Sequence, residues 1–282
     1  MSNLSNKINS YSPEVSVQLN GAYTLNPTNE GTMSILTWSL SNTAPTGFTT
    51  GGPTGGAGYW SIPDTTRWRN QAASGTNMNN SFLDYNYTVG FWFRFPVLPT
   101  ANLAVGKLIG AVLTSAGGLG FEVALSGSAY TTAPSKLHVR DSGTTYVNTG
   151  VTIEANKWYF VVAQRFSQSG SNNVKYYLNG QLILTRTNNG TSGFSSLQFG
   201  NVTATDPVAF HLSNVFTGPT ANFTEAAILD IYNTGNPPAD FPLKYWDGSA
   251  WTTPLNKYQW DGVNWITMVG KVWNGSSWIN II

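Results

Sequence analysis

Short apolar runs separated by turn residues dominate this chain, and the two clearest lie between residues 157 and 185. Both faces of the first run are apolar, since Trp158, Phe160 and Val162 alternate with Tyr159, Val161 and Ala163. A strand with two apolar faces is covered on both sides. The run therefore predicts a strand inside a two-layer β-sandwich.

The second run predicts a β-hairpin. Val174–Leu178 is followed by Asn179-Gly180 and by a return run, Gln181–Thr185. Asn-Gly between apolar alternations is a strong hairpin signal, because a type I′ turn requires positive φ at both central residues. The expected cross-strand neighbours are Leu178 with Gln181, Tyr176 with Ile183, and Val174 with Thr185.

Other apolar runs also predict strands. They are Val15–Leu19, Met33–Leu40, Tyr87–Phe95, Lys107–Leu113, Leu119–Leu125, Lys136–Arg140, Thr144–Val147, Ser195–Phe199 and Val208–Phe216. Within Tyr87–Phe95, Trp92 and Arg94 share one face, and the opposite face is aromatic and aliphatic. Residues 41–81 predict mostly loop, and a connection of that length is usually functional or poorly ordered.

One segment near residue 230 predicts a helix. Thr224 is a suitable N-cap, Glu225 lies where the helix dipole favours an anion, and Gly235 is a suitable C′ residue. Pro237-Pro238 then predicts the start of a linker.

The apolar runs, the predicted helix and the linker that follows it divide the chain into three parts. Residues 1–14 are polar and aperiodic and predict an N-terminal arm, either frayed or docked on a neighbouring chain. Residues 15–236 contain the strand runs and the helix, and predict an all-β sandwich domain. Residues 237–282 predict a separate module of small β-hairpins.

Three copies of Trp-[Asp/Asn]-Gly-x-x-Trp make up that module. They span Trp246 to Trp251, Trp260 to Trp265, and Trp273 to Trp278. A two-residue turn would place Trp246 across from Ser249, and Lys271 across from Trp278, where a cation–π contact is worth about 0.5–1 kcal/mol. One hairpin cannot bury two indoles alone, so we expect the repeats to stack on one another or on other chains.

The block KWYFVVAQRF with VKYYLNGQLI, the run YTVGFWFRF and the segment FTEAAILDIYNTG resemble laminin-G-like domains of the concanavalin-A-like jelly-roll group. The resemblance covers roughly Tyr87 to Gly235. It implies two stacked antiparallel sheets with one short terminal helix, and by itself it implies no function. The tryptophan repeats resemble those at the C-termini of phage tail-fibre and appendage proteins.

Composition narrows the function classes. Only 10% of residues are charged, against about 25% in typical soluble domains. The net charge is +1, so neither nucleic acid nor membrane insertion is expected. Cysteine is absent, which excludes disulfides and thiolate metal sites. Residues 1–15 lack the apolar stretch of a secretory signal, so we expect a virion protein made in the host cytoplasm.

Catalytic patterns are not found. Glucanases of the concanavalin-A-like group carry Glu-x-Asp-x-x-Glu on one strand, whereas Glu122, Glu154 and Glu225 are isolated in the sequence. His138 and His211 lie in predicted strands without zinc-ligand spacing. We therefore expect no enzyme, and two acids brought together by folding remain the alternative.

Aromatic recognition of sugars is the remaining chemistry, because Trp and Tyr rings pack on the apolar faces of sugar rings. The candidate ligand-binding residues are Trp60, Trp68, Tyr130 and Tyr146. The alternative interpretation places Trp60 in an edge strand with Tyr59 and Ile62, and Trp68 in the end of the sandwich, as core residues.

The laminin-G-like resemblance also implies a single calcium ion. Asp206 is the candidate ligand, and the alternative interpretation is an acidic residue of a surface loop. No other cofactor is expected.

The sequence therefore predicts a non-enzymatic phage virion protein, such as a fibre, spike or head-decoration protein, whose sandwich binds a host surface glycan. Its expected partners are other virion proteins and copies of itself, because a homotrimer would let the repeats of several chains bury one another. The alternatives are a secreted carbohydrate-binding protein with no phage connection and a polysaccharide-cleaving enzyme.

Overall fold

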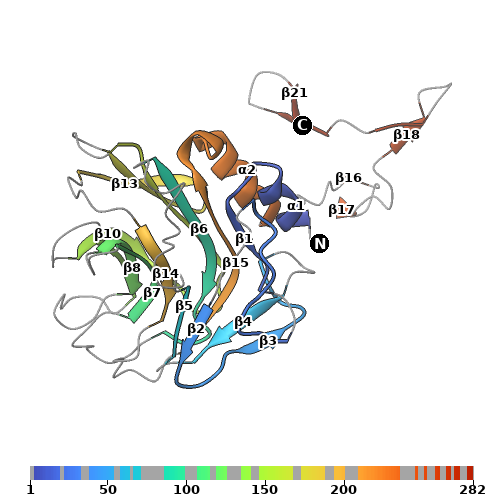
Figure 1. The fold of residues 1–282 in the computed structure, drawn as a ribbon. Helices are drawn as coiled ribbons and strands as arrows, with labels where there is room; N and C mark the ends of the chain where they lie inside the picture. Colours follow the sequence, from blue (N-terminus) through green and yellow to red (C-terminus); the bar gives the residue numbers. More distant parts are fainter. Residues whose placement is uncertain are drawn as a thin grey trace. The chain divides into compact units, whose positions relative to one another are not determined.

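The chain divides into two units, Met1–Asn236 and Pro237–Ile282. The computed structural model describes residues 3–19, 22–32, 38–53, 58–63, 66–70, 86–98, 107–114, 119–125, 135–140, 146–167, 173–187, 194–200, 209–235, 245–246, 251–252, 258–260, 265–267, 270–273 and 278–281. Within these residues, the first unit contains two antiparallel sheets and two α-helices, and the second contains three two-stranded hairpins (Figure 1).

The larger sheet of the first unit is called sheet A. Its strands are β1 (Val15–Val17), β3 (Thr46–Phe48), β4 (Tyr59–Ile62), β6 (Tyr87–Arg94), β11 (Tyr159–Arg165), β12 (Val174–Leu178), β13 (Gln181–Arg186) and β15 (Phe210–Pro219). They lie in the order β13-β12-β11-β6-β15-β4-β3, and β1 also pairs with β15. Strands β6 and β11, which have apolar residues on both faces, therefore lie inside the sheet.

The second sheet, sheet B, lies against the inner face of sheet A (Figure 1). Its strands are β2 (Trp38–Ser41), β5 (Arg67–Asn70), β7 (Lys107–Thr114), β8 (Leu119–Leu125), β9 (Lys136–Arg140), β10 (Val147–Thr152) and β14 (Phe194–Phe199). They lie in the order β10-β9-β8-β7-β14-β5-β2. The predicted two-sheet jelly-roll sandwich is confirmed.

Two of the local predictions for strands need correction. Residues 41–81 were expected to be mostly loop, but β3, β4 and β5 lie in the described part of this segment. These strands have only three or four residues each, so their alternation is too short to stand out in the sequence. The strand expected at Thr144–Val147 lies further along, at β10.

Aromatic side chains fill the space between the sheets. Trp38 stacks on Trp68 with ring centroids 3.8 Å apart, and Trp60 meets the edge of Trp68 at 5.2 Å. Phe91 of β6 meets Phe199 of β14 edge-on at 5.3 Å, which joins the two sheets directly. Edge-to-face pairs such as the last two add about 0.5–1.5 kcal/mol beyond burial.

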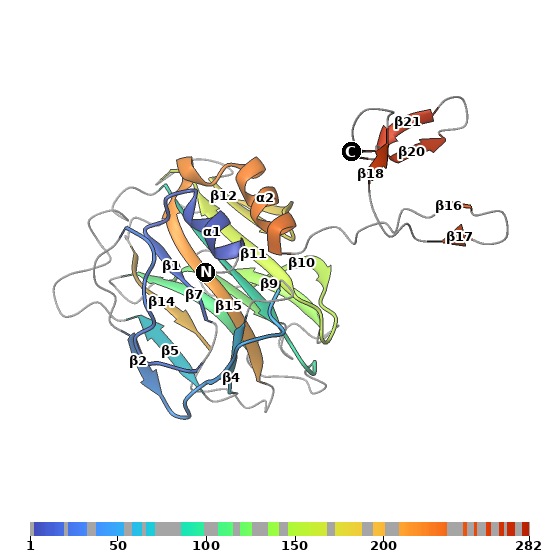
Figure 2. The ribbon, with the colours of Figure 1, turned by 90° about the vertical axis from the view of Figure 1, so that its right-hand side faces the viewer.

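The outer face of sheet A is covered by a helical layer made of α1 (Asn3–Asn9) and α2 (Glu225–Gly235), as Figures 1 and 2 show. The residues packed in this second cluster include Trp92, Phe160 and Val162 of the sheet and Ile228 and Ile231 of α2. The two apolar faces predicted for β6 and β11 are therefore confirmed. One face meets sheet B, and the other meets the helices.

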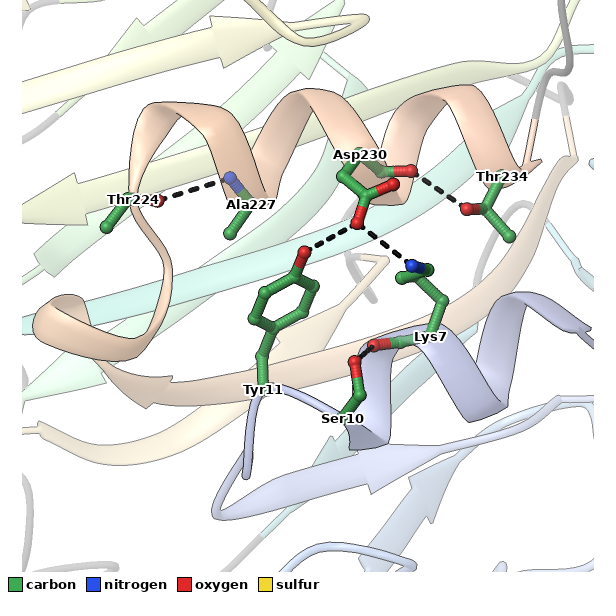
Figure 3. A network of polar contacts seen from close by, with 7 residues as sticks. All are labelled: Lys7, Ser10, Tyr11, Thr224, Ala227, Asp230 and Thr234. Atoms are coloured by element: carbon green, nitrogen blue, oxygen red, sulfur yellow. Dashed lines mark hydrogen bonds and ion pairs between the residues drawn. The ribbon is translucent and has the colours of Figure 1, made fainter.

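The predicted N-terminal arm is wrong, because residues 3–9 form α1. Leu4 and Ile8 are buried, 0% and 1% exposed, and they lie one helical turn apart on the face toward the sheet. Asp230 of α2 accepts a hydrogen bond from the Tyr11 hydroxyl at 2.6 Å and forms an ion pair with Lys7 at 3.0 Å (Figure 3). Both bonds lower the pKa of the Asp230 carboxyl, and the bond from Tyr11 has the larger effect.

The predicted helix cap and hairpin turn are present. The Thr224 hydroxyl accepts a hydrogen bond from the Ala227 amide at 3.2 Å (Figure 3). Asn179 and Gly180 have φ of 52° and 79°, as a type I′ turn requires.

The register of this hairpin agrees with the prediction only next to the turn. Leu178 pairs with Gln181 as expected, but Tyr176 pairs with Leu184 and Val174 with Arg186. A bulge between Tyr176 and Tyr177 accounts for the one-residue difference.

Candidate functional site

Beyond each end of α2, side chains of the outer face of sheet A reach the surface in the described part of the chain. Helix α2 begins at Glu225, near Asn86 at the start of β6. It ends at Gly235, where an added Cβ would contact the Trp92 indole. One open place lies at the first turn of α2, and the other lies beyond Trp92, around Arg94.

The first place is a hollow of about 460 Å³, called here the α2 pocket. Its volume falls within the range of about 300–1,000 Å³ that is common for small-ligand sites. Its walls come from β11, β12 and the 3-10 helix η2 (Thr220–Asn222), from residues next to β6 and β11, and from the start of α2. The lining residues are Asn86, Gln164, Phe166, Lys175, Thr220, Ala221, Phe223, Thr224 and Glu225.

The charged groups of the α2 pocket are paired with each other. Lys175 forms an ion pair with Glu225 at 2.9 Å, and the Tyr177 hydroxyl donates to the same carboxylate at 3.0 Å. Both bonds lower the pKa of the Glu225 carboxyl, and the bond from Lys175 has the larger effect. The Lys175 ammonium also lies 5.1 Å from the centre of the Phe166 ring, which is 38% exposed. The pocket thus presents a neutral pair of charges beside an open aromatic ring.

The second place is called the Arg94 cluster and consists of Phe48, Tyr59, Arg94, Trp158 and His211. His211 lies directly across from Arg94 in the pairing of β15 with β6. The Arg94 guanidinium carbon lies 5.0 Å from the Tyr59 ring centre and 4.9 Å from that of Trp158. Cation–π contacts of this kind are worth about 0.5–2 kcal/mol each. They hold the guanidinium in one position.

His211 fixes the other side of the guanidinium. The Nε of Arg94 donates to Nδ1 of His211 at 3.1 Å, and Nη2 lies 2.8 Å from the same atom. The pKa of His211 is lowered to about 4. Burial is the larger cause, and the positive charge of Arg94 is the smaller one. At neutral pH the imidazole is therefore uncharged, with its proton on Nε2, because Nδ1 must accept the bond from Arg94.

The outer rim of the Arg94 cluster is aromatic. Phe48 stacks on Tyr59 with ring centroids 4.6 Å apart and is 41% exposed. Trp158 is partly buried, and its indole N–H donates to the carbonyl of Gly51 at 3.0 Å. The rim therefore has one open ring and one indole whose orientation is set by a hydrogen bond.

Two of the ligand-binding candidates from the sequence lie in the sandwich core. Trp60 is 1% exposed and Trp68 is 0% exposed, so neither ring has a face open to a ligand. Their positions follow the core interpretation, except that β4 lies between β15 and β3 and is not an edge strand.

The other candidates lie apart from both open places or cannot be located. Tyr146 lies just before β10, and the Arg140 guanidinium lies 4.6 Å from its ring centre. Tyr130 and Asp206 lie outside the described residues. No group of three or more His, Asp or Glu side chains in the described part of the chain is placed to hold a metal ion, so the calcium site stays a prediction.

The repeat module contains three hairpins: β16 (Tyr245–Trp246) with β17 (Trp251–Thr252), β18 (Tyr258–Trp260) with β19 (Trp265–Thr267), and β20 (Gly270–Trp273) with β21 (Trp278–Ile281). The two tryptophans of each repeat are directly paired: Trp246 with Trp251, Trp260 with Trp265, and Trp273 with Trp278.

The expected two-residue turn is therefore wrong, since four residues separate the paired tryptophans. Lys271 pairs with Asn280 and not with Trp278. Direct pairing of aromatic residues across two strands is itself favourable, and this is the register that the hairpins adopt.

The residues of both open places come from segments far apart in the sequence. Arg94 and His211 are 117 residues apart, and Lys175 and Glu225 are 50 apart. The only sequence signal for the Arg94 cluster is a charged residue on a face of β6 that also carries Trp92. No helix among the described residues is long and apolar enough to cross a membrane.

Comparison with known families and structures places the sandwich in a known group. A family model described as the concanavalin A-like lectin/glucanases superfamily, Laminin_G_3, matches residues 54–217. No curated protein matches the sequence.

Several solved structures have the same fold. The receptor binding domain of botulinum neurotoxin C/D mosaic serotype is 14% identical, with a TM-score of 0.57 over 79% of this chain and 51% of the other. The ligand binding domain of botulinum neurotoxin serotype D, in complex with N-acetylneuraminic acid, is 15% identical, with a TM-score of 0.54 over 79% and 51%. The binding domain of Paraclostridial Mosquitocidal Protein 1 is 13% identical, with a TM-score of 0.57 over 82% and 53%. The chain thus spans about half the length of these structures, and at this identity the likeness shows the fold alone.

Proposed function

The chain belongs to the concanavalin A-like lectin/glucanases superfamily, and on that premise we propose that its first unit is a non-catalytic, lectin-like domain that binds a host surface glycan. The fold neighbours support this class of partner, since one was solved with N-acetylneuraminic acid and another is a neurotoxin whose cell entry depends on two ganglioside molecules. Because the chain matches only about half of each neighbour, they support a glycan in general and no particular sugar.

The observation that carries the proposal is the α2 pocket. A sugar ring offers an apolar face and a rim of hydroxyl groups, so a site for it needs an open aromatic ring with hydrogen-bonding groups around it. Phe166 supplies the ring, and Asn86, Thr224 and the Lys175–Glu225 pair lie in the same lining. Because the two charges neutralise each other, the pocket suits a neutral sugar.

The electrostatics of this pocket support binding over hydrolysis. A glycosidase needs a general acid whose pKa is raised, so that it holds a proton at neutral pH. Glu225 is the acidic residue of the lining, and its pKa is lowered by Lys175 and Tyr177. It stays ionised at neutral pH and acts as a hydrogen-bond acceptor.

The experiment that tests the pocket compares Phe166→Ala with Leu182→Ala. Both replace a partly exposed apolar side chain, 38% and 47% exposed, but only Phe166 lines the pocket. On a glycan array followed by calorimetry, we expect Phe166→Ala to weaken binding about tenfold, a loss of about 1.4 kcal/mol. Leu182→Ala should bind like the wild type. Equal affinity of the two variants would contradict the assignment of this site.

We extend the proposal to a phage virion protein, a fibre, spike or head-decoration protein, in which the repeat module assembles with copies of itself. Its support is the set of three hairpins with paired tryptophans and their resemblance to repeats of phage appendage proteins. Immunogold labelling of purified particles should mark the virion. A gene neighbourhood without capsid, portal or tail genes would favour a secreted carbohydrate-binding protein.

A polysaccharide-cleaving enzyme is tested separately. Incubation with host capsule or exopolysaccharide should release no new reducing ends. If new ends appear, and the Glu225→Gln variant does not produce them, the non-catalytic part of the proposal is wrong.

A further inference from the structure

Among the described residues of the first unit, Arg94 differs from the paired lysines in having no carboxylate beside it. Lys7, Lys157 and Lys175 pair with Asp230, Glu154 and Glu225. The contacts of Arg94 are instead the uncharged His211 imidazole and the rings of Tyr59 and Trp158. A partly exposed guanidinium held in place without a counter-ion is complementary to an anion from outside the chain.

The direction of the guanidinium leaves suitable donors for such an anion. Arginine has five N–H groups, and the Nε and Nη2 donors of Arg94 both approach the single acceptor Nδ1 of His211. The two N–H groups of Nη1 and the second of Nη2 make no hydrogen bond to any residue that the structure describes. Together, Nη1 and Nη2 form the planar edge that binds a carboxylate through two parallel hydrogen bonds.

The surroundings of this edge favour a ring over a flexible acidic chain. Phe48 is 41% exposed and stacks on Tyr59, which in turn contacts the guanidinium. Trp158 is oriented by its bond to Gly51. An acidic peptide offers carboxylates on mobile stems, whereas a sugar acid offers a carboxylate fixed to a ring whose C–H face packs on an aromatic surface.

We propose that the Arg94 cluster is a second binding site, for a pyranose that carries a carboxylate, such as a uronic or sialic acid residue of a surface polysaccharide. Arg94 binds the carboxylate, and Phe48 and Trp158 contact the sugar ring. His211 positions Arg94 and keeps the site at one net positive charge, because it is itself neutral.

The site extends the proposed glycan-binding function but is separate from the α2 pocket. Arg94 lies at the end of β6, and Asn86, which lines the pocket, precedes its start. The eight residues of β6 span roughly 23 Å at about 3.3 Å per residue. Each site can therefore be changed without altering the other.

The test measures binding of the full chain to two matched pairs of sugars by calorimetry and biolayer interferometry. The pairs are sialyllactose with its methyl ester, and oligogalacturonate with its methyl ester, so that each pair differs in its charged carboxylate. We expect the acidic member of at least one pair to bind at least tenfold more tightly at low salt, and this preference to shrink at 0.5 M salt as screening increases.

Three variants identify the site. Arg94→Gln should bring acidic and neutral members of the pair within about twofold of each other. Phe48→Ala should weaken binding of the acidic member about fivefold, because the contact with the sugar ring is lost. Phe166→Ala, in the α2 pocket, should leave the preference intact. Circular dichroism and thermal unfolding check the fold of each variant. If Arg94→Gln does not fold, Phe48→Ala still tests the site, because the Phe48 ring is open to solvent.

Several results would overturn this inference while leaving the proposed function standing. Neutral sugars could bind through the α2 pocket with no preference for the acidic members, or the preference could persist in Arg94→Gln. Phe48→Ala could also bind the acidic member as tightly as the wild type does. A polyglutamate peptide that competes as well as oligogalacturonate at equal carboxylate concentration would show a general anion contact and not a sugar site. If no glycan of any kind binds, the proposed function fails as well.

Discussion

His211 illustrates how a single side chain couples the stability of this fold to pH. Burial and the neighbouring Arg94 lower its pKa from 6.5 to about 4. A group whose pKa is depressed in the folded state stabilises that state above its unfolded pKa, and the contribution is lost as the pH falls. The loss therefore begins near pH 6.5 and is complete below about pH 4. Its full size is about 3 kcal/mol at 1.36 kcal/mol per pKa unit.

We expect the wild type to lose about 2 kcal/mol more stability than His211→Gln between pH 7.5 and 4.5. The amide oxygen of glutamine can accept the bond from Arg94 but does not titrate. The pKa of His138 is also lowered by burial, and this contribution cancels because both proteins contain His138. Urea unfolding at the two pH values measures the difference, and parallel losses in the two proteins would contradict it.

Gly90 of β6 is required by the ring that lies against it. A Cβ added at this position would clash with the Phe216 ring of β15, because it would lie closer to the ring carbons than non-bonded atoms can approach. Gly90→Ala should therefore destabilise the fold by about 1–3 kcal/mol, the usual cost of overpacking. Thr46→Ala, an exposed position on β3, is the control and should change stability by about 0.5 kcal/mol or less. A Gly90→Ala variant as stable as this control would show that Phe216 can move aside.

At the residue scale, the sequence predicts what depends on local chemistry. Asn179-Gly180 has the turn geometry expected of it, and Thr224 caps the helix as expected. The meeting of Arg94 with His211 could not be predicted, since it depends on the register of β15 against β6. That register shifts between Ser213 and Phe216, where Asn214 has a φ of 43°. A single asparagine inside an apolar run does not by itself predict a bulge.

At the scale of elements, α1 shows why a short helix is hard to predict. Seven residues cannot form a stable helix alone, because nucleation costs more than so few hydrogen bonds return. The helix exists because Leu4 and Ile8 dock on the outer face of sheet A and Lys7 and Tyr11 bind Asp230. The polar residues between them hide this pattern in the sequence.

Leu4→Ala should destabilise the first unit by about 2–4 kcal/mol, since a fully buried leucine is lost. Asn6→Ala, on the exposed side of α1, should have little effect. Denaturant unfolding of both variants provides the measurement. If Leu4→Ala has no effect, residues 3–9 behave in solution as the free arm that the sequence suggested.

At the scale of the whole molecule, the chain contains two units of different character. The first has its own core between two sheets, and a second apolar cluster under the helices. The second consists, in its described residues, of hairpins of two to four residues per strand, and isolated hairpins of this size are at best marginally stable.

Removal of residues 237–282 should therefore leave the thermal unfolding midpoint of the sandwich within a few degrees of the full chain. Under the proposed trimer, light scattering should give about three times the chain mass of 30.5 kDa for the full chain and a monomer after truncation. A monomeric full-length protein would contradict the proposed assembly but would not affect the glycan-binding proposal.

The contact between α1 and α2 has a consequence for protein engineering. The first helix and the last helix of the sandwich unit pack on each other through Lys7, Tyr11 and Asp230, so the beginning and the end of this unit lie on the same surface. A short peptide joining them would allow circular permutation, with new termini opened at the exposed turn of Ala155 and Asn156, between β10 and β11.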